Sequence, residues 1–415
     1  MRSSSPRKNI LLLIPQLTYG GAERVFHDHG QELARQHRVI ECVFDSSTEV
    51  AFPTRNTLVA LDIPAGSGVG GKLLTFWRRI QRVRALKREH SIDVCISHLE
   101  GADYLNLLSK GHEKVLLCVH NSKRHDPNIR GALGWLRRRV LMPWLYRAAD
   151  YIVPVSRELR QELLDTFGLQ PEKVVTINNF FDVEGIRRRS LEPLPIAAQA
   201  LFTQYPVLIT AGRLAHEKNQ RALLDVLALL RTQGHNAPRL ALLGDGPLRA
   251  DLLRRCQELD LRRWQIWDEQ PLTTDFDVYF FGFQSNPFQY IARARVSLLS
   301  SATEGFPMAL CEAMACGVPV ASTDCPTGPR EILAPLTPAA HYAATPEWAE
   351  FGLLLPLLGQ GQEVAGAAPQ WSGALLELLA SPDRIEHYRT QALVRVQNFG
   401  PEPIMQQWEA LLHKA

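Results

Sequence analysis

Residues 300–320 read Ser-Ser-Ala-Thr-Glu-Gly-Phe-Pro-Met-Ala-Leu-Cys-Glu-Ala-Met-Ala-Cys-Gly-Val-Pro-Val, directly after the apolar run 296–299. The run predicts a buried strand. Pro307 is suited to the first position of a helix, and residues 308–316 predict about two and a half helical turns. Gly317 then supplies the helix end. Strand, polar loop and helix in this order are the repeating unit of a parallel α/β sheet.

The same unit recurs along the whole chain. Apolar runs predict strands in the first half at 10–14, 38–44, 92–96, 115–119, 151–155 and 174–177, with helices at 104–108 and 157–167. In the second half, strands are predicted at 207–211, 239–243, 278–281, 296–299 and 318–321, with a terminal helix at 406–413. Short strands that alternate with helices predict an α/β protein with two Rossmann-like sheets.

A Pro-rich connection, Ser190-Leu-Glu-Pro-Leu-Pro195, interrupts this alternation. We therefore predict an N-terminal domain at 1–190, a C-terminal domain at 191–398 and a terminal helix at 399–415 that packs back on the first domain. Two such domains joined once are expected to face each other across a cleft. Because open α/β sheets bind ligands at the carboxyl ends of their strands, the site is expected in that cleft.

The composition excludes several classes of protein. The 415 residues are 46% hydrophobic and 21% charged, which is typical of a globular chain and excludes disorder and a disulfide-dependent mini-protein. The seven cysteines include no Cys-x-x-Cys pair, which predicts reduced thiols in a cytoplasmic protein and no zinc site. No apolar run approaches about 18 residues, so no membrane-spanning helix is predicted.

The charge of the chain is unevenly distributed. Residues 1–190 hold 29 Lys and Arg against 20 Asp and Glu, whereas the rest hold 17 against 23. A basic first half indicates an anionic partner there.

A cationic cluster follows the predicted strand 207–211. Gly212 and Arg213 come directly after the strand, and Lys218 lies five positions further on. Arginine binds phosphate oxygens as a fork and lysine as a point charge, so both side chains can reach one diphosphate. Two exposed loop cations without a ligand remain the alternative.

Two carboxylates, Glu304 and Glu312, flank the start of the predicted helix 308–316. A helix N-terminus is a ready anion site. Carboxylates beside a phosphate site suit a nucleotide-sugar, because one can hold the ribose hydroxyls and the other can lie beside the sugar. A solvated surface position for Glu312 remains open.

Two further motifs follow strands of the first half. Gly20 and Gly21 follow the strand 10–14, and paired glycines let a ligand approach the backbone closely. They lack the G-x-G-x-x-G spacing of a dinucleotide site. His120 follows the strand 115–119, where a side chain is expected to face the cleft. A plain tight turn and a structural histidine remain the alternatives.

Together these motifs resemble the retaining glycosyltransferases of the GT-B fold, the "glycosyl transferases group 1" family, in its bacterial surface-glycan members. The resemblance covers nearly the whole chain and rests on Gly-Gly-Ala-Glu-Arg at 20–24, Gly212-Arg213 with Lys218, Gly-Asp-Gly-Pro at 244–247, Glu304 with Glu312, and Thr323 to Ile332.

The resemblance implies that the second domain holds a nucleotide-diphosphate sugar, with UDP favoured. Arg213 and Lys218 would neutralise the diphosphate, and Glu312 would bind the ribose. The implied donor-binding residues are Gly212, Arg213, Lys218, Glu304, Gly305, Phe306, Pro307, Met308, Ala309 and Glu312. The implied acceptor-side residues are Gly20, Gly21 and His120. The residues implied in catalysis are His120, Glu304, Arg213 and Lys218.

The implied reaction is transfer of the sugar to a hydroxyl of a glycan or lipid-linked acceptor, with retention of anomeric configuration, in lipopolysaccharide or polysaccharide synthesis. No metal or other cofactor is implied. The other readings are a catalytically silent nucleotide-sugar-binding scaffold, a nucleotide-sugar epimerase of related fold and a dinucleotide oxidoreductase.

Two basic stretches of the first half, 72–88 and 130–147, interleave Trp, Leu and Arg. This pattern is typical of helices that lie at an anionic membrane interface, and it predicts a cytoplasmic protein peripheral on the inner face of the cell membrane. An amphipathic helix with its apolar face in the core is the alternative. Nucleic acid is not expected as a partner, because no nucleic-acid-binding module is recognised.

Overall fold

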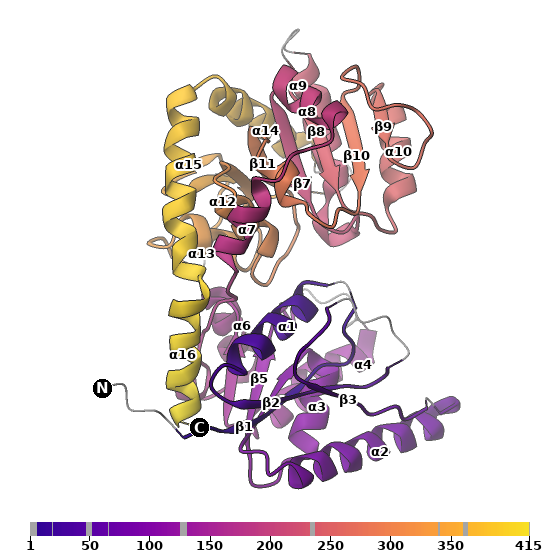
Figure 1. Cartoon of the computed structure of the whole chain (residues 1–415), viewed down its shortest axis with the longest axis vertical. Coiled ribbons are helices and arrows are strands. Elements are labelled where there is room, and N and C mark those ends of the chain that lie inside the picture. Colours follow the sequence, from indigo (N-terminus) through magenta and orange to yellow (C-terminus); the bar gives the residue numbers. More distant parts are fainter. Residues whose placement is uncertain are drawn as a thin grey trace. The chain divides into compact units, whose positions relative to one another are not determined.

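The computed structural model describes residues 6–18, 20–46, 52–64, 66–124, 131–232, 237–338, 341–359 and 364–414. The chain divides into two compact units (Figure 1). The first contains Met1–Phe180 and Pro401–Ala415, and the second contains Phe181–Gly400.

The first unit is built on a six-stranded parallel sheet with the strand order β3-β2-β1-β4-β5-β6. This order reverses next to β1, which is the topological switch point of a doubly wound sheet. The strands are β1 (Asn9–Leu13), β2 (Arg38–Val43), β3 (Thr57–Ala60), β4 (Val94–His98), β5 (Lys114–Val119) and β6 (Tyr151–Pro154).

Helices pack on both faces of this sheet. They are α1 (Gly21–Leu33), α2 (Gly68–Glu89), α3 (Glu100–Leu108), α4 (Gly131–Leu136), α5 (Met142–Tyr146), α6 (Arg157–Phe167) and the C-terminal α16 (Pro401–Lys414), with a π-helical turn at Arg137–Leu141 between α4 and α5.

The alternation of side chains along β1 explains why this strand is apolar at every buried position. Ile10 and Leu12 belong to a core that includes Trp408 of α16. Leu11 and Leu13 belong to a separate core with residues of α2 and α3. Successive residues of a strand point to opposite faces, so a strand covered on both faces needs apolar residues throughout.

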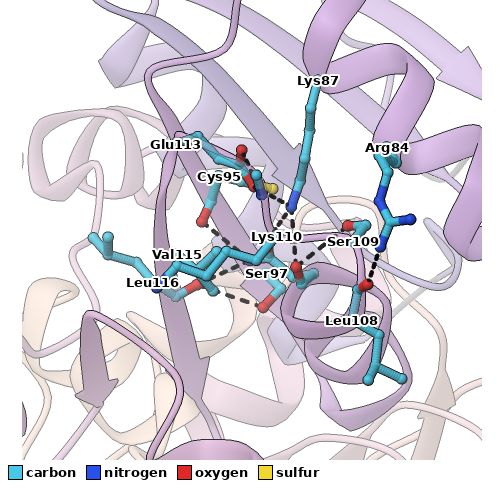
Figure 2. A network of polar contacts seen from close by, with 12 residues as sticks. Arg84, Lys87, Cys95, Ser97, Leu108, Ser109, Lys110, Glu113, Val115 and Leu116 are labelled. Atoms are coloured by element: carbon cyan, nitrogen blue, oxygen red, sulfur yellow. Dashed lines mark hydrogen bonds and ion pairs between the residues drawn. The ribbon is translucent and has the colours of Figure 1, made fainter.

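A buried ion pair joins α2 to the loop before β5. Lys87 points toward Glu113, and their Nζ and Oε1 atoms lie 2.7 Å apart (Figure 2). Lys87 also donates hydrogen bonds to the backbone and side-chain oxygens of Asn106 in α3, at 3.0 and 2.9 Å. Both charged side chains are almost fully buried, so the pair and its hydrogen bonds fix α2 against α3.

The second unit is built on an eight-stranded sheet with the order β13-β14-β12-β11-β7-β8-β10-β9. The strands are β7 (Val207–Ala211), β8 (Arg239–Leu243), β9 (Arg263–Gln265), β10 (Val278–Gly282), β11 (Val296–Leu299), β12 (Val320–Thr323), β13 (Glu347–Ala349) and β14 (Gly352–Leu355). β13 pairs antiparallel to β14, and the other pairings are parallel.

The helices of this unit cover its sheet. They are α7 (Val183–Ser190), α8 (Ile196–Gln204), α9 (Gln220–Arg231), α10 (Arg249–Glu258), α11 (Phe288–Ile291), α12 (Met308–Ala315), α13 (Pro329–Leu333), α14 (Val364–Leu379) and α15 (Pro382–Val396). Buried leucines of α9 and α14 share one core with β8 and β11.

The division between the units lies at 180/181, ten residues before the predicted boundary at 190/191. Helix α7, which precedes the Pro-rich connection, packs against α11 and α12. The side-chain amide of Asn286 donates to the Arg189 carbonyl oxygen at 2.9 Å, and the Arg189 guanidinium lies 4.8 Å from the Phe288 ring centre. The prolines therefore mark a connection inside the second unit.

One strand prediction was wrong, and four strands were not predicted. Residues 174–177 form no strand; Val174 makes one parallel bridge to Ile152, and Arg160 of α6 donates to the Val174 carbonyl. The strands β3, β9 and β13 were missed because they are short and partly exposed, and the buried apolar run of β14 was overlooked. Among the described residues, no helix combines the length and the hydropathy needed to cross a bilayer.

Candidate functional site

Two glycine-containing turns bring the loops after β7 and β8 to backbone distance. Gly212 has φ of +151° and Gly244 has φ of +125°. A Cβ atom on Gly244 would lie 2.1 Å from the Gly212 carbonyl oxygen. Only glycine fits at position 244, so the close approach of the two loops is built into the sequence.

Arg213 leaves this turn toward solvent. Its side chain is 66% exposed, and its Nη2 lies 2.7 Å from Glu217 Oε1. The backbone beneath it is held by the side-chain amide of Gln220, which donates to the Arg213 carbonyl oxygen at 2.9 Å. The guanidinium is thus placed on a fixed loop and stays open to an anionic ligand.

Lys218 and Glu304 form an ion pair with Nζ and Oε1 2.7 Å apart. Ser301 donates a hydrogen bond to the same carboxylate oxygen at 2.5 Å. The Glu304 side chain is only 9% exposed. Burial by itself would lower the pKa of Lys218, but the charge of Glu304 and their hydrogen bond raise that pKa above its ordinary value. Lys218 is therefore a fixed positive charge at neutral pH.

Backbone contacts lock the two loops that carry this pair. Ser300 Oγ donates to the Lys218 carbonyl oxygen at 2.8 Å, and the Ala302 amide donates to the Glu217 carbonyl at 2.9 Å. The loops follow β7 and β11, which are neighbours in the sheet. Parallel strands end at one edge, which is why the ends of these strands bring a cation and a carboxylate together.

A third loop, after β12, packs on the Glu304 loop. The Glu304 amide donates to the Pro326 carbonyl at 3.2 Å, and the Thr327 hydroxyl donates to the Glu304 carbonyl. Gly328 has φ of +103°, and a Cβ there would lie 2.5 Å from Pro307 Cδ. The Glu304 loop is therefore fixed on both sides.

The remaining residues predicted for the donor lie on or beside α12. Gly305, Phe306 and Pro307 are buried, Met308 and Ala309 begin the helix half-buried, and Glu312 lies half-buried near its middle. Pro307 is the N-cap residue of α12. The sequence had predicted it as the first residue of that helix.

The Phe306 ring packs on aromatic rings of the second unit. Its centre lies 6.3 Å from that of Phe181 and 5.2 Å from that of Phe399. The side chain is thus part of the core, and only the backbone of Phe306 is left for a ligand.

In the first unit, Gly20 and Gly21 form the start of α1. Gly20 is the N-cap residue, and its carbonyl accepts from the Arg24 amide at 3.0 Å. A Cβ on Gly20 would lie 2.2 Å from Glu23 Oε2, whereas a Cβ on Gly21 would meet no atom within 4 Å. Gly21 therefore leaves open space at the helix start.

His120 lies after β5 and pairs with a histidine that the sequence interpretation overlooked. His98, the last residue of β4, places its Nδ1 2.9 Å from His120 Nε2. The two strands are parallel neighbours, with His98 opposite Cys118. His98 ends an apolar run as His120 does, so the rule that selected His120 also selects His98.

These rings line a small pocket together with His29, Asn178 and Trp408. Burial lowers the pKa of His29 to about 3 and, with the charge of Lys123, lowers that of His120 to about 4. Burial also lowers the pKa of His98 well below its ordinary value. All three imidazoles are neutral at pH 7.

Two motifs in the chain do not act as their spacing suggests. Asp275 and Asp277 form an Asp-x-Asp triplet, but Asp277 is buried beside arginines and Asp275 accepts from Thr273. Among the described residues, no group of three acidic, His or Cys side chains converges as metal ligands do. A G-x-G-x-x-G spacing at 66–71 runs into the first turn of α2 and follows the edge strand β3, not β1 where a dinucleotide fingerprint belongs.

Comparison with known proteins gives two family matches. The model described as "Glycosyltransferase Family 4" matches residues 19–184, and that described as "Glycosyl transferases group 1" matches residues 205–349.

Named relatives are similar over different shares of the chain. The amylovoran biosynthesis glycosyltransferase AmsD of Erwinia amylovora is 22% identical over 97% of this chain and 99% of its own. The N-acetylgalactosamine-N,N'-diacetylbacillosaminyl-diphospho-undecaprenol 4-alpha-N-acetylgalactosaminyltransferase of Campylobacter jejuni is 28% identical over 60% of this chain and 63% of its own.

Among solved structures, HepE of Anabaena in complex with UDP and glucose superposes with a TM-score of 0.73 at 18% identity, over 99% of this chain and 100% of that one. The likeness covers both units and shows the fold.

Proposed function

The chain belongs to the glycosyl transferases group 1 family of GT-B-fold glycosyltransferases, and we propose that it transfers a sugar from a UDP-sugar to a hydroxyl of a lipid-linked or lipopolysaccharide acceptor in a bacterium. The observation that carries the donor half of this proposal is the Lys218–Glu304 pair. It fixes an ammonium at the strand ends of the second unit, where α/β sheets bind their ligands. The neighbouring Arg213 guanidinium is exposed and supplies a second positive charge.

The leaving diphosphate gains negative charge as the bond to the sugar breaks. Arg213, Lys218 and the backbone at the start of α12 stabilise that charge in our proposal, so no metal ion is required. Preorganised donors of this kind cost no reorganisation during the reaction. The hydrogen bonds that lock the Lys218 and Glu304 loops support this assignment, because they hold the ammonium in place before the ligand arrives.

The sugar is transferred with retention of configuration in this account. The acceptor hydroxyl attacks from the face that the diphosphate leaves, and a leaving phosphate oxygen takes the hydroxyl proton. Glu304 is engaged by Lys218 and Ser301, which supports a positioning part and not that of a nucleophile. Glu312 binds the ribose hydroxyls, and His120 with the Gly20–Gly21 turn lies on the acceptor side.

The acceptor class is proposed from two relatives. The Campylobacter relative is named for a diphospho-undecaprenol acceptor, and the Erwinia relative for amylovoran biosynthesis. We assign this chain to the same class of acceptor, with the particular sugar left to the donor assay.

The first unit is proposed to dock on the anionic cytoplasmic face of the cell membrane. Three tryptophans support this: Trp77 on α2 is 56% exposed, and Trp135 and Trp144 on α4 and α5 are 56% and 67% exposed. α2 buries Ile80, Val83 and Leu86 in the core and still leaves Trp77 exposed, so this ring is not needed for the packing of the helix. Large amphipathic rings beside basic side chains suit a membrane interface.

Further exposed apolar residues lie on the same helical segments as these tryptophans: Val69, Leu73, Leu74, Leu136, Val140 and Leu141. Together with the three tryptophans they are called here the apolar docking surface. The half-buried Arg138 and the exposed Arg139 lie in the same segment as Leu136 and Val140. Arg130, which begins the second basic stretch, lies outside the described residues. Helices α2 and α5 both pack on α3, so the two parts belong to one layer of the unit.

A thermal-shift panel tests the donor assignment. The chain is melted with UDP-, GDP-, ADP- and dTDP-sugars and with NAD, with and without EDTA. A ligand at about 100 times its dissociation constant adds about 2.7 kcal/mol of stability. A shift with UDP-sugars that EDTA leaves unchanged supports the proposal. A shift with NAD alone, or with none of the compounds, contradicts it and favours the oxidoreductase or scaffold reading.

A further inference from the structure

We infer that His98 is a positioning residue for His120: it holds the His120 ring and, through the hydrogen bond between them, couples the tautomer of that ring to its own. The inference rests on the proposed acceptor-side role of His120. It adds a residue from a different strand, one that contacts His120 and that the proposed chemistry does not use.

The geometry leaves His98 with one polar contact among the described residues. Its Nδ1 lies 2.9 Å from His120 Nε2, and its Nε2 is buried without a hydrogen-bond partner. The side chain is fully enclosed. The ring of Phe26 stands edge-on to it at 5.3 Å between centres, and His29 does so at 5.8 Å. An imidazole this tightly packed presents Nδ1 to His120 in a single orientation.

The enclosure of His98 is maintained from two helices. Phe26 and His29 belong to α1, and the Trp408 ring of α16 lies 4.2 Å from that of His29. Trp408 of the C-terminal helix thus packs against His29, and His29 packs against His98. Rotation of the His98 ring would displace these neighbours, so its orientation is set by the core of the unit.

A neutral imidazole has one N–H and one bare nitrogen, so a hydrogen bond between two neutral rings links their tautomers. When His98 donates from Nδ1, His120 accepts at Nε2 and carries hydrogen on Nδ1. When His98 accepts, His120 carries hydrogen on Nε2 and its Nδ1 is bare. Nδ1 is the other polar atom of the His120 ring, so the direction of the hydrogen bond with His98 decides whether that atom donates to or accepts from an acceptor hydroxyl.

The groups that face the pair do not replace this link. Lys123 faces His120 and its ammonium lies 3.9 Å from Glu100, so it is engaged by a carboxylate. His29 faces His98, with its own Nε2 unpartnered among the described residues. The hydrogen bond between His98 and His120 is therefore the contact through which the tautomer of His120 can be set.

Nitrogen NMR of the full chain with ¹⁵N-labelled histidine tests the inference without any ligand. The variants are His98→Asn, which keeps a polar group near the Nδ1 position, and His98→Leu, which removes it. We expect His98→Leu to shift the His120 Nδ1 and Nε2 signals toward those of a freely exchanging tautomer mixture, and His98→Asn to shift them less. Val83→Ala, in the separate core on α2, is the packing control and should leave the His120 signals nearly unchanged. Unchanged His120 signals in folded His98→Leu overturn the inference.

Turnover then separates this inference from the proposed function. It is measured as UDP release from UDP-N-acetylgalactosamine and UDP-galactose with a bacterial lipid and lipopolysaccharide extract. We expect His98→Leu to lower kcat by about 10- to 100-fold, with KM for the UDP-sugar unchanged and with partial recovery in His98→Asn. If His120→Ala loses turnover and His98→Leu does not, the positioning role is wrong. If His120→Ala keeps wild-type turnover, the proposed role of His120 is wrong, whatever the NMR signals show.

Discussion

Lys218 Nζ lies 2.7 Å from Glu304 Oε1, although the two residues stand 86 positions apart in the sequence. Neither residue lies where two helices pack together. Each follows a strand, and the strands β7 and β11 are neighbours in one sheet. Because these strands are neighbours, the sheet topology brings two motifs that are separate in the sequence into one charged site. In the proposed function, a diphosphate that enters this site meets an ammonium whose position is already fixed.

Removal of Glu312 tests its contact with the ribose. Hydrogen bonds to a charged group contribute about 1.5–3 kcal/mol, so Glu312→Ala should weaken UDP binding by about 10- to 100-fold. Calorimetric titration with UDP and with 2′,3′-dideoxy-UDP completes a double-mutant cycle. In wild type the dideoxy compound should bind more weakly, and in Glu312→Ala the two should bind equally.

The control for this cycle is Glu377→Ala, since Glu377 is an exposed carboxylate of α14 that pairs with Arg384. It should bind UDP as wild type does. Equal preference for UDP over the dideoxy compound in Glu312→Ala and in wild type would remove Glu312 from the ribose contact.

The buried pair Lys87–Glu113 should dominate the stability of its corner of the first unit. Lys87→Met leaves the buried Glu113 carboxylate without its partner. For a buried pair this lowers the free energy of unfolding by about 3–5 kcal/mol. The double variant Lys87→Met/Glu113→Leu should recover part of that loss. Urea unfolding, followed by circular dichroism, measures the free energies.

Arg82→Met is the matched control, because Arg82 on the same helix pairs with Glu89 at the surface at 3.1 Å. An exposed pair contributes about 0–1 kcal/mol, so this variant should unfold close to wild type. If Lys87→Met costs no more than Arg82→Met, the buried pair does not have the structural role given to it.

Acid should destabilise the first unit through its buried histidines. Their pKa values in the folded chain lie below the ordinary value of about 6.5, at about 3 for His29 and about 4 for His120. The unfolded chain therefore binds more protons below pH 6.5. Above pH 6.5 these histidines do not reduce the free energy of unfolding. As pH falls from 6.5 toward 4, each histidine lowers it by about 1.4 kcal/mol per pH unit.

Asp103 opposes this trend, because burial raises its pKa to about 7. It destabilises the folded chain as pH rises from its ordinary value toward 7, so the net acid effect is smaller than the histidines alone would give. Urea unfolding at pH 7 and pH 5 should show lower stability at pH 5, and a smaller difference in His29→Leu. Equal stability at both pH values in wild type and a larger difference in His29→Leu would contradict the assignment.

The apolar docking surface should bind anionic vesicles. Phosphatidylglycerol-rich vesicles should sediment with wild type at low salt and release it at high salt, because the basic residues contribute through screened charge. Replacement of Trp77, Trp135 and Trp144 by Ser should lower the partition coefficient at least about tenfold, since each ring loses its apolar contact with the interface.

Ile196→Ser is the control for the vesicle assay, because Ile196 is an exposed apolar residue of the second unit. It should sediment as wild type does. The proposed membrane docking is contradicted if wild type does not bind the vesicles or binds them regardless of salt. It is also contradicted if Ile196→Ser and the tryptophan variant lose binding equally.

The sequence predicted the long apolar strands and the placement of the charged motifs at their ends. Residues 207–211 and 239–243 are strands with the bounds expected, because buried parallel strands are apolar at every position. The edge strand β3 escaped prediction, since its half-exposed residues lack that signal.

The sequence did not predict which loops, far apart in the chain, contact one another. Nothing in the order of residues indicates that Lys218 pairs with Glu304 or that Thr327 holds the Glu304 backbone. The pairing of His98 with His120 depends on the register of β4 against β5. The unit boundary was displaced because α7 packs on helices that follow it by about a hundred residues, and prolines report local breaks only.

Titration of UDP into the full chain in the presence of EDTA tests whether Lys218 holds the diphosphate without a metal ion. We expect binding in EDTA by wild type and by Arg221→Ala, which removes a cation of α9 that is paired with Asp251 and Glu258. We expect a loss of affinity of about 10- to 100-fold in Lys218→Ala, because a charge-assisted contact with the diphosphate is removed. Binding that disappears in EDTA, or an affinity unchanged in Lys218→Ala, would contradict this role of Lys218.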